Sequence, residues 1–252
     1  MNNGRPTIVA DLVSLSHEFG HRELVILGEG NVSARLDDLT FLVKASGTSL
    51  GSLVEENLTE CRFDRLFSFF GDEPVSDAEV EAALLQSRVD PGALKPSVET
   101  FFHAFLLSLP DIRFVGHTHP IAVNQILCSS HARDFSRQRQ CPDEVVCCGP
   151  VSLLIPYIDP GLALARRIRD ELAAFQLVHG KLPRVILLEN HGVITVGSSV
   201  QAVRAAMLMT VKAAQIYIGA QQLGNLTHLP ESEVTRIESR LDEEYRRKML
   251  RL

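Results

Sequence analysis

Apolar positions along this chain recur at two different spacings. After Pro6 and after Pro96 they return every three or four residues, which is the pattern of amphipathic helices. Elsewhere they form short runs of four or five residues bounded by polar or glycine-containing turns, which indicates buried strands. Ser76 and Glu79 have the spacing of a capping box that starts a further helix. The expected helices begin near Pro6, Ser76 and Ser97 or span residues 161–178, 202–223 and 231–250, and the expected strands span residues 32–36, 40–44, 112–115, 151–155, 185–188 and 193–196.

The order of these elements favours one fold class. Helices and strands are mixed, yet they do not alternate regularly as they do in a doubly wound parallel sheet. We therefore expect an α/β fold, namely a three-layer α/β/α single domain over residues 1–252 with a mostly antiparallel central sheet. Residues 37–38 predict the turn of a hairpin. The polar stretch at residues 131–142 predicts a mobile loop inside the domain, because apolar periodicity resumes on both sides of it.

Composition narrows the classes of function. The 252 residues include 25 Lys and Arg against 31 Asp and Glu, and the net charge of −6 argues against binding to nucleic acid or an anionic membrane. No apolar run approaches the roughly 20 residues of a membrane-spanning helix, and the N-terminal segment lacks the pattern of a secretory signal. The five cysteines form no CxxC pair and are odd in number, which fits reduced thiols in the cytoplasm.

Histidines stand where two of the expected strands end. His117 and His119 are two positions apart, so both imidazoles of a strand at this place point to the same face. His191 follows the apolar run 185–188 and precedes a glycine that permits a tight turn. Adjacent strands would bring the three imidazoles together, and three protein ligands with one open position are typical of a catalytic zinc. The alternative is a set of separate hydrogen-bonded histidines.

A carboxylate accompanies the helix that is expected to begin at Ser97. Glu99 would lie in the first turn of this helix, where the helix dipole favours the ionised form. It could serve as a fourth metal ligand, as a catalytic base, or only as a structural carboxylate at the helix start. His103 follows four residues later on the same face, and we expect it behind Glu99 or in the core.

Two short polar turns offer groups that bind phosphate oxygens. One belongs to the segment GEGN and the other follows the expected strand 40–44. Backbone N–H groups, hydroxyls and an amide in such turns suit a phosphate, and Lys44 and Arg35 are near in sequence. The same turns also occur in proteins that bind no phosphate. The residues that offer such groups in these turns are Asn31, Ser46, Gly47, Thr48 and Ser49.

Taken together, five segments resemble a known family. GEGNVS, VKASG, KPSVE, GHTHP and ENHG occur in the order of the motifs of the class II aldolase/adducin family, and the resemblance covers about residues 8–225. A C-terminal helix is expected after it, at about residues 230–250. The resemblance implies an α/β/α fold around a mostly antiparallel sheet. It also implies one zinc ion, or a similar divalent transition metal, per chain at a subunit interface, usually in a homotetramer.

The resemblance further implies roles for individual residues. The metal ligands would be His117, His119 and His191. Glu99 would be the catalytic carboxylate, which can also ligate the metal when no substrate is bound. The phosphate of the substrate would be held by Asn31, Ser46, Gly47 and Ser97. Many phosphate-binding members have a second hydroxyl residue where this chain has Val98, and Thr48 or Ser49 could supply the missing contact.

The implied activity is reversible aldol cleavage of a sugar phosphate, or of a related hydroxy-carbonyl compound, through a metal-stabilised enediolate. Glu99 would move the proton. Members of the fuculose-phosphate aldolase type use tyrosines as general acid, and this chain has no tyrosine in the polar loop after HTHP. We expect its three tyrosines, Tyr157, Tyr217 and Tyr245, to pack against neighbouring residues. The alternative for Tyr245 is a role like that of the C-terminal tyrosine of such members.

Other activities remain open for the same set of residues. A sugar-phosphate 4-epimerase, a dehydratase or a 3-oxo-acid decarboxylase could use the same metal and carboxylate. A different alternative is an adducin-like scaffold that keeps the fold without catalysis. The complete set of three histidines and a glutamate favours an enzyme over the scaffold. We expect a small-molecule substrate, a cytoplasmic location, a homotetramer with interfacial sites, and neither nucleic acid nor membrane as a partner.

Overall fold

Within residues 4–252, which the computed structural model describes, seven strands form a mixed sheet in the order β3-β2-β1-β4-β7-β6-β5. The chain divides into two compact units. The first contains residues 4–115 and Ile158–Asp170, and the second contains Gly116–Tyr157 and Glu171–Leu252. β4 (Phe114–Thr118) and α8 (Leu162–His179) have residues in both units. The single-domain organisation over residues 1–252 stays a prediction.

The first unit starts with a helix and an antiparallel meander. The elements of this part, in chain order, are α1 (Arg5–Phe19), β1 (Asn31–Arg35), β2 (Thr40–Lys44), the short 3-10 turns η1 (Leu50–Ser52) and η2 (Glu55–Asn57), and β3 (Leu58–Arg62). β2 pairs antiparallel with both β1 and β3. Asp37 closes the turn between β1 and β2, because its Oδ1 accepts hydrogen bonds of 2.8 Å from the backbone N–H groups of Leu39 and Thr40. The hairpin expected at residues 37–38 is confirmed.

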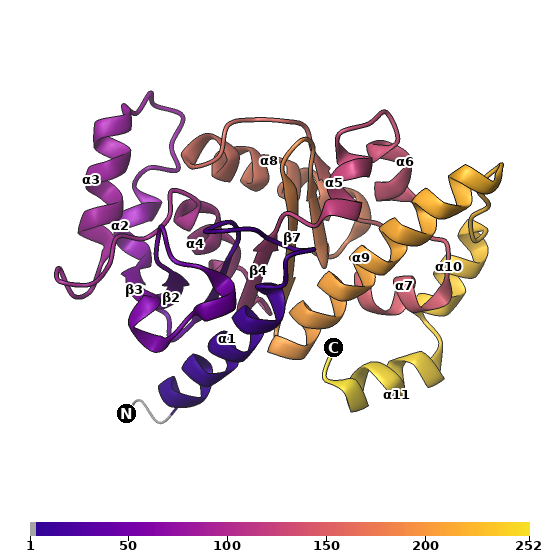
Figure 1. Cartoon of the computed structure of the whole chain (residues 1–252), viewed down its shortest axis with the longest axis horizontal. Helices are drawn as coiled ribbons and strands as arrows, with labels where there is room; N and C mark the ends of the chain where they lie inside the picture. Colours follow the sequence, from indigo (N-terminus) through magenta and orange to yellow (C-terminus); the bar gives the residue numbers. More distant parts are fainter. Residues whose placement is uncertain (1–3) are drawn as a thin grey trace. The chain divides into compact units, whose positions relative to one another are not determined.

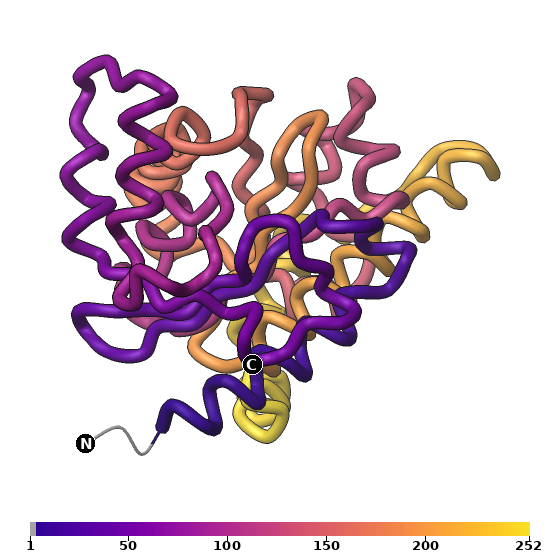
Figure 2. Tube along the Cα trace, turned by 60° about the vertical axis from the view of Figure 1, so that its left-hand side comes forward, coloured from indigo at the N-terminus to yellow at the C-terminus, as the bar shows by residue number. Residues whose placement is uncertain are grey.

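Besides the part of α8 that belongs to it, the first unit contains three more helices after β3. They are α2 (Phe63–Phe67), α3 (Asp77–Ser87) and α4 (Thr100–Ser108), and α2 and α3 lie side by side (Figures 1 and 2). The capping box at the start of α3 is confirmed: Ser76 Oγ accepts from the Glu79 N–H at 3.3 Å, and Glu79 Oε2 accepts from the Ser76 N–H at 2.8 Å. α4 is apolar on most sides, and its phenylalanines Phe101 and Phe102 are fully buried.

The start of α4 differs from the sequence-based expectation. The helix begins at Thr100 and not at Ser97, so Glu99 occupies the N-cap position ahead of the first helical residue. The reason is a turn over Ser97: its carbonyl oxygen accepts from the Thr100 N–H at 3.0 Å, and its hydroxyl accepts from the Glu99 N–H at 3.3 Å. This turn takes the place of the expected first helical turn.

The second unit combines strands with a larger set of helices. In chain order they are α5 (Ile121–Leu127), α6 (Ala132–Arg137), α7 (Pro142–Cys148), β5 (Leu153–Ile155), β6 (Val185–Leu188), β7 (Gly192–Gly197), α9 (Val200–Leu223), α10 (Glu231–Glu238) and α11 (Leu241–Leu250). β6 pairs antiparallel with β7 and parallel with β5, and α9 packs on β7, α5 and α7. Three of the four strand pairings with a described register are therefore antiparallel, as expected.

Two expectations about the second unit are wrong. The stretch 131–142 is not a loop throughout, since it contains α6 and the fully buried Arg139. The C-terminal segment is not one helix over 230–250, because it breaks between α10 and α11 (Figure 1). At this break Ser239 Oγ donates to the carbonyl oxygens of Thr235 and Arg236, and Arg240 is extended. A serine that binds the preceding carbonyls competes with continuation of the helix.

In the part of the chain that the structure describes, no helix is both long and apolar enough to cross a membrane. All five cysteines are free thiols. Burial raises the pKa of the Cys61 and Cys148 thiols to about 12, so both are protonated packing residues at neutral pH.

Candidate metal centre and associated carboxylate

Three histidines gather in the second unit. His117 belongs to β4, His119 follows the end of this strand, and His191 lies in the turn between β6 and β7. Their ring centroids are 4.8–4.9 Å apart in every pair, and one nitrogen from each ring lies within 4.8 Å of the others. The Nε2 atoms of His117 and His119 are 3.0 Å apart. Two nitrogens bound tetrahedrally to one zinc would be about 3.3 Å apart, so the cluster has the dimensions of a metal site.

The strand and the turn explain why the three rings meet. Alternation along β4 places His117 and His119 on one side and Thr118 on the other, where its hydroxyl donates to Met207 Sδ at 3.0 Å. The turn that holds His191 is fixed by Asn124, whose Nδ2 donates to the His191 carbonyl oxygen at 2.9 Å. Asn190 supplies the left-handed backbone that the turn needs, with φ of 55°.

A hydrogen bond sets the ring of His117 for metal binding. Its Nδ1 lies 3.0 Å from the carbonyl oxygen of Val193, and a carbonyl can only accept, so Nδ1 has the proton. The lone pair of the neutral ring is then on Nε2, which faces the other two histidines. A backbone carbonyl that orients a histidine in this way is the usual second partner of a metal ligand.

Space for the cluster comes from Gly192. A Cβ at this position would lie 2.7 Å from Cδ2 of His119 and 3.2 Å from Cε1 of His117. The rings can thus occupy their positions only because residue 192 has no side chain. Three imidazole nitrogens around one point form a donor set that suits zinc and several other divalent transition metals.

A second cluster of polar side chains is buried in the first unit around Glu99. Asn31 Nδ2 donates to Glu99 Oε2 at 2.6 Å, and the Asn31 Oδ1 accepts from His103 Nε2 in a short hydrogen bond. On the far side of the ring, Ser33 Oγ lies 2.6 Å from His103 Nδ1. All four side chains are at least nine-tenths buried. Asn31 was expected at the phosphate, and its amide is directed to the carboxylate.

The two polar turns are joined by Lys44. Its Nζ donates to the carbonyl oxygens of Gly28 at 3.2 Å and Thr48 at 2.6 Å, one from each turn. Burial lowers the pKa of Lys44 to about 8, and the negative charge of Glu99 opposes this shift. Lys44 was expected to add positive charge near a phosphate, whereas the structure directs its ammonium into the protein. It stabilises both turns.

The expected phosphate-binding residues lie in these turns and before α4. Gly47 has φ of 75°, which favours glycine, and the Ser46 N–H already donates to the Lys95 carbonyl oxygen at 2.8 Å. The Thr48 hydroxyl donates to the Ala45 carbonyl oxygen at 2.8 Å, which leaves its lone pairs available to a donor. Their role in phosphate binding stays a prediction.

The structure thus brings together two subsets of the expected site residues. The three histidines meet in the second unit, and Asn31 meets Glu99 in the first. The contribution of Ser33 was missed. Its signal in the sequence was a pair of polar residues, Asn31 and Ser33, that alternate with the apolar Val32 and Ala34, so both point to one face.

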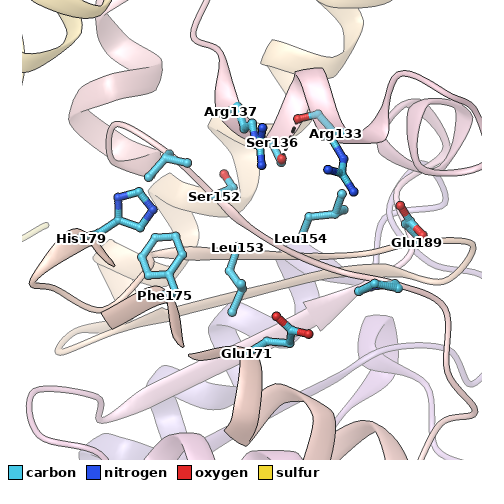
Figure 3. A pocket seen from close by; sticks show the side chains of 12 residues that line it. Arg133, Ser136, Arg137, Ser152, Leu153, Leu154, Glu171, Phe175, His179 and Glu189 are labelled. Atoms are coloured by element: carbon cyan, nitrogen blue, oxygen red, sulfur yellow. Dashed lines mark hydrogen bonds between the residues drawn. The ribbon is translucent and has the colours of Figure 1, made fainter. Parts of the chain in front are cut away.

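The second unit also contains a cavity of about 360 Å³ beside β5. Arginines of α6 and Glu171 of α8 line different sides of it (Figure 3). The Ser136 hydroxyl, also on α6, donates to the Arg133 carbonyl oxygen at 2.7 Å. The expected site residues are not among its lining residues, which are Arg133, Ser136, Arg137, Val151, Ser152, Leu153, Leu154, Pro156, Glu171, Phe175, His179 and Glu189.

The chain is similar in sequence to a known protein family and to individual known proteins. The family model described as Class II Aldolase and Adducin N-terminal domain matches residues 10–218. The chain is 29% identical over 231 residues to a protein of Haemophilus influenzae named 3-oxo-tetronate 4-phosphate decarboxylase, covering 91% of this chain and 95% of that protein. It is 27% identical over 222 residues to the Bacillus subtilis protein named uncharacterized oxidoreductase YuxG, covering 84% of this chain. The match spans only 30% of that Bacillus protein.

A solved structure supports the fold. The structure of an L-fuculose 1-phosphate aldolase superposes with a TM-score of 0.70 at 16% identity, covering 95% of this chain and 96% of that one. At this level of identity the similarity concerns the fold alone. The predicted α/β fold class, α/β/α layers around a mostly antiparallel central sheet, is confirmed.

Proposed function

The chain belongs to the class II aldolase and adducin family, and we propose that it is a metal-dependent carbon–carbon lyase acting on a sugar phosphate or a related hydroxy-carbonyl compound. The leading reaction is reversible aldol cleavage through an enediolate. The observation that carries the proposal is the cluster of His117, His119 and His191, whose nitrogens lie within 4.8 Å of one another. A scaffold without catalysis has no need of such a cluster.

The three histidines would hold one divalent ion, for which we propose zinc. When bound, the ion would supply Lewis-acid stabilisation of the negative charge that develops on the substrate oxygens beside the breaking bond. The chain's own contribution is to align the imidazoles. The Val193 carbonyl does this for His117.

Glu99 is proposed as the base from its place in the motif KPSVE. In aldol cleavage the carboxylate would take the proton of the substrate hydroxyl, whose carbon becomes a new carbonyl group. The electron pair of the broken carbon–carbon bond would pass to the other fragment, which already contains the substrate carbonyl and becomes the enediolate. The same carboxyl group could return the proton to the resulting enediolate. Its burial excludes water from the oxygen that accepts the hydrogen bond of Asn31. Ser46, Gly47, Thr48 and Ser97 are proposed to bind the substrate phosphate.

Decarboxylation of a 3-oxo acid is the second candidate. The Haemophilus influenzae relative, of which the match covers 95%, is named as a decarboxylase of this kind. In this reaction carbon dioxide leaves with no hydroxyl proton to remove, and the enediolate that remains needs only a proton donor.

We further propose a cytoplasmic enzyme that works as a homotetramer. The free cysteines are consistent with the first point, since disulfides are rare in the cytoplasm.

The metal proposal is tested by measuring bound metal per chain. Replacing any one of His117, His119 or His191 with Ala should reduce the bound metal from about one ion per chain to a small fraction. His179→Ala removes an exposed histidine of the same unit and should leave metal content unchanged. Equal metal content in all four variants would disprove the assignment of the three ligands.

The reaction is tested with a panel of substrates. Phosphorylated ketoses, including L-fuculose 1-phosphate, and 3-oxo acids, including 3-oxo-tetronate 4-phosphate, would be assayed for cleavage, epimerisation, loss of water and release of carbon dioxide. Cleavage supports the leading candidate, and carbon dioxide release supports the second. Glu99→Gln should abolish exchange of the donor fragment's proton with solvent while the metal content stays near one per chain. Retained exchange would exclude Glu99 as the base.

A further inference from the structure

A buried chain of hydrogen bonds connects Ser33 with Glu99. The links are Ser33 Oγ to His103 Nδ1 at 2.6 Å, the short bond between His103 Nε2 and Asn31 Oδ1, and Asn31 Nδ2 to Glu99 Oε2 at 2.6 Å. All four residues belong to the first unit. Ser33 and His103 are completely buried, and Asn31 and Glu99 are 3% and 8% exposed. None of these links is accessible enough for water to replace it freely.

The chemistry of the groups gives this chain one direction. An ionised carboxylate only accepts, so the group of Asn31 that faces Glu99 must be its NH2. The amide oxygen of Asn31 then faces His103 and needs a donor, which fixes a proton on Nε2. The neutral ring has its lone pair on Nδ1, and Ser33 is the donor that reaches it. A rotated Asn31 amide would put two acceptors together, its own oxygen and the Glu99 carboxylate oxygen.

Building on the proposed function, we infer that His103 is a positioning residue that acts through Asn31 to hold the Glu99 carboxylate in the orientation required for proton transfer. The Asn31 amide oxygen selects the ring tautomer that allows this, and the Ser33 hydroxyl donates to the lone pair that this tautomer leaves on Nδ1. The ring of His103 is hydrogen-bonded to Ser33 and to Asn31, and the Asn31 amide carries the connection on to Glu99. The backbone contributes as well, because the His103 N–H donates to the Glu99 carbonyl oxygen at 3.3 Å in the first turn of α4. The side chain and the helix therefore restrain Glu99 from two directions.

The inference separates His103 from a residue that only fills space. A packing residue would be replaced well by phenylalanine, which has a ring of similar breadth but no donor. A positioning residue would be replaced better by glutamine, whose side-chain NH2 can donate to Asn31 from about the place of Nε2. Thr100→Val provides a matched control on the same helix. The Thr100 hydroxyl is fully buried and has no hydrogen-bond partner within residues 4–252.

Kinetics of the holoenzyme give the first test. With the substrate identified under the proposed function, His103→Phe should lower kcat by about 100-fold with little change in KM, since misplacement of a catalytic group by about 1 Å has an effect of this size. His103→Gln should recover most of the loss, and Thr100→Val should behave as the wild type. Metal content should be the same in all three. An unchanged kcat in His103→Phe, or an equal loss in the Gln and Phe variants, would overturn the inference.

Nuclear magnetic resonance provides a test that needs no turnover. In protein labelled with ¹⁵N-histidine, the signals absent from His103→Gln identify His103, and we expect a protonated Nε2 and an unprotonated Nδ1. Ser33→Ala should shift mainly the Nδ1 signal. In protein labelled at glutamate carboxyl carbons, the Glu99 signal, identified by Glu99→Gln, should move in His103→Phe and stay in Thr100→Val. A protonated Nδ1 of His103, or a Glu99 signal that does not change in His103→Phe, would overturn the inference. If no substrate of the panel reacts, the proposed function fails while these signals still decide the inference.

Discussion

At the scale of single residues, the absence of a side chain at Gly192 has the clearest consequence. A Cβ there would lie 2.6 Å from the Thr118 carbonyl oxygen and 2.7 Å from Cδ2 of His119, closer than real side chains approach. Neither neighbour can move away easily, because one is strand backbone and the other is a ring of the histidine cluster. The glycine that the sequence marks as a tight turn is therefore also the space that the cluster occupies.

We expect Gly192→Ala to displace the histidine rings. Overpacking of this kind costs about 1–3 kcal/mol of the free energy of unfolding, and misplaced ligands should weaken metal affinity by about 10-fold or more. Urea denaturation and calorimetric metal titration measure the two effects. Gly219→Ala is the matched control, because on α9 no atom lies within 4 Å of the added Cβ and alanine favours a helix. Full metal affinity in Gly192→Ala would contradict the steric argument.

How far the site could be predicted also depends on individual residues. The i, i+2 spacing of His117 and His119 is a local property of one strand, so it could be recognised in the sequence. The link between Asn31 and Glu99 joins residues 68 positions apart, and it exists because β1 lies beside α4. No local sequence pattern predicts which side chain of a strand will face a given side chain of a helix that is distant in the sequence. The chain through Ser33 was missed for this reason.

At the scale of elements, Arg139 organises the segment that was expected to be a loop. Its Nε donates to the Gly149 carbonyl oxygen at 2.7 Å and one terminal nitrogen donates to Ser152 Oγ at 2.9 Å. The other terminal nitrogen lies 3.7 Å from a carboxylate oxygen of Glu144 on α7, and both side chains are almost completely buried. Burial raises the pKa of Glu144, and the positive charge of Arg139 opposes this. One side chain thus connects the end of α6, α7 and the residue before β5.

We expect Arg139→Met to lower the free energy of unfolding by about 3–5 kcal/mol, because it leaves Glu144 buried without its charge partner. The double variant Arg139→Met with Glu144→Leu should recover part of this loss, since no buried charge remains uncompensated. Arg133→Met, at an exposed position of the preceding helix α6, serves as the control and should change stability little. Equal stability of the Arg139 and Arg133 variants in urea denaturation would contradict the role of the buried pair.

Elements with local signals were predicted well. The capping box of α3 and the hairpin closed by Asp37 depend on residues within four positions of one another, and both are confirmed. The region of α6 was misjudged because its polar composition is typical of loops, whereas Arg139 satisfies its charge inside the protein. The end of α10 was missed because it depends on one serine that binds the preceding carbonyls, a feature that hydrophobic periodicity does not contain.

At the scale of the whole molecule, the expected homotetramer rests on the family resemblance and on apolar side chains left at the surface. Leu177, Leu223 and Leu241 are between 81% and 93% exposed in the single chain. All three leucines belong to the second unit, and a partner subunit that covers them would remove them from water. In a tetramer with interfacial sites, assembly and activity would depend on the same contacts.

We therefore expect light scattering to give a mass close to four times the 27.8 kDa of one chain. Dilution that dissociates the assembly should lower activity per chain in parallel with the mass, because each site would lose its neighbouring subunit. The three histidines belong to one chain, so metal content per chain should fall much less than activity on dilution. This difference distinguishes an interfacial site from a tetramer that merely stabilises its subunits. A mass near that of one chain with full activity would disprove both the tetramer and the interfacial site.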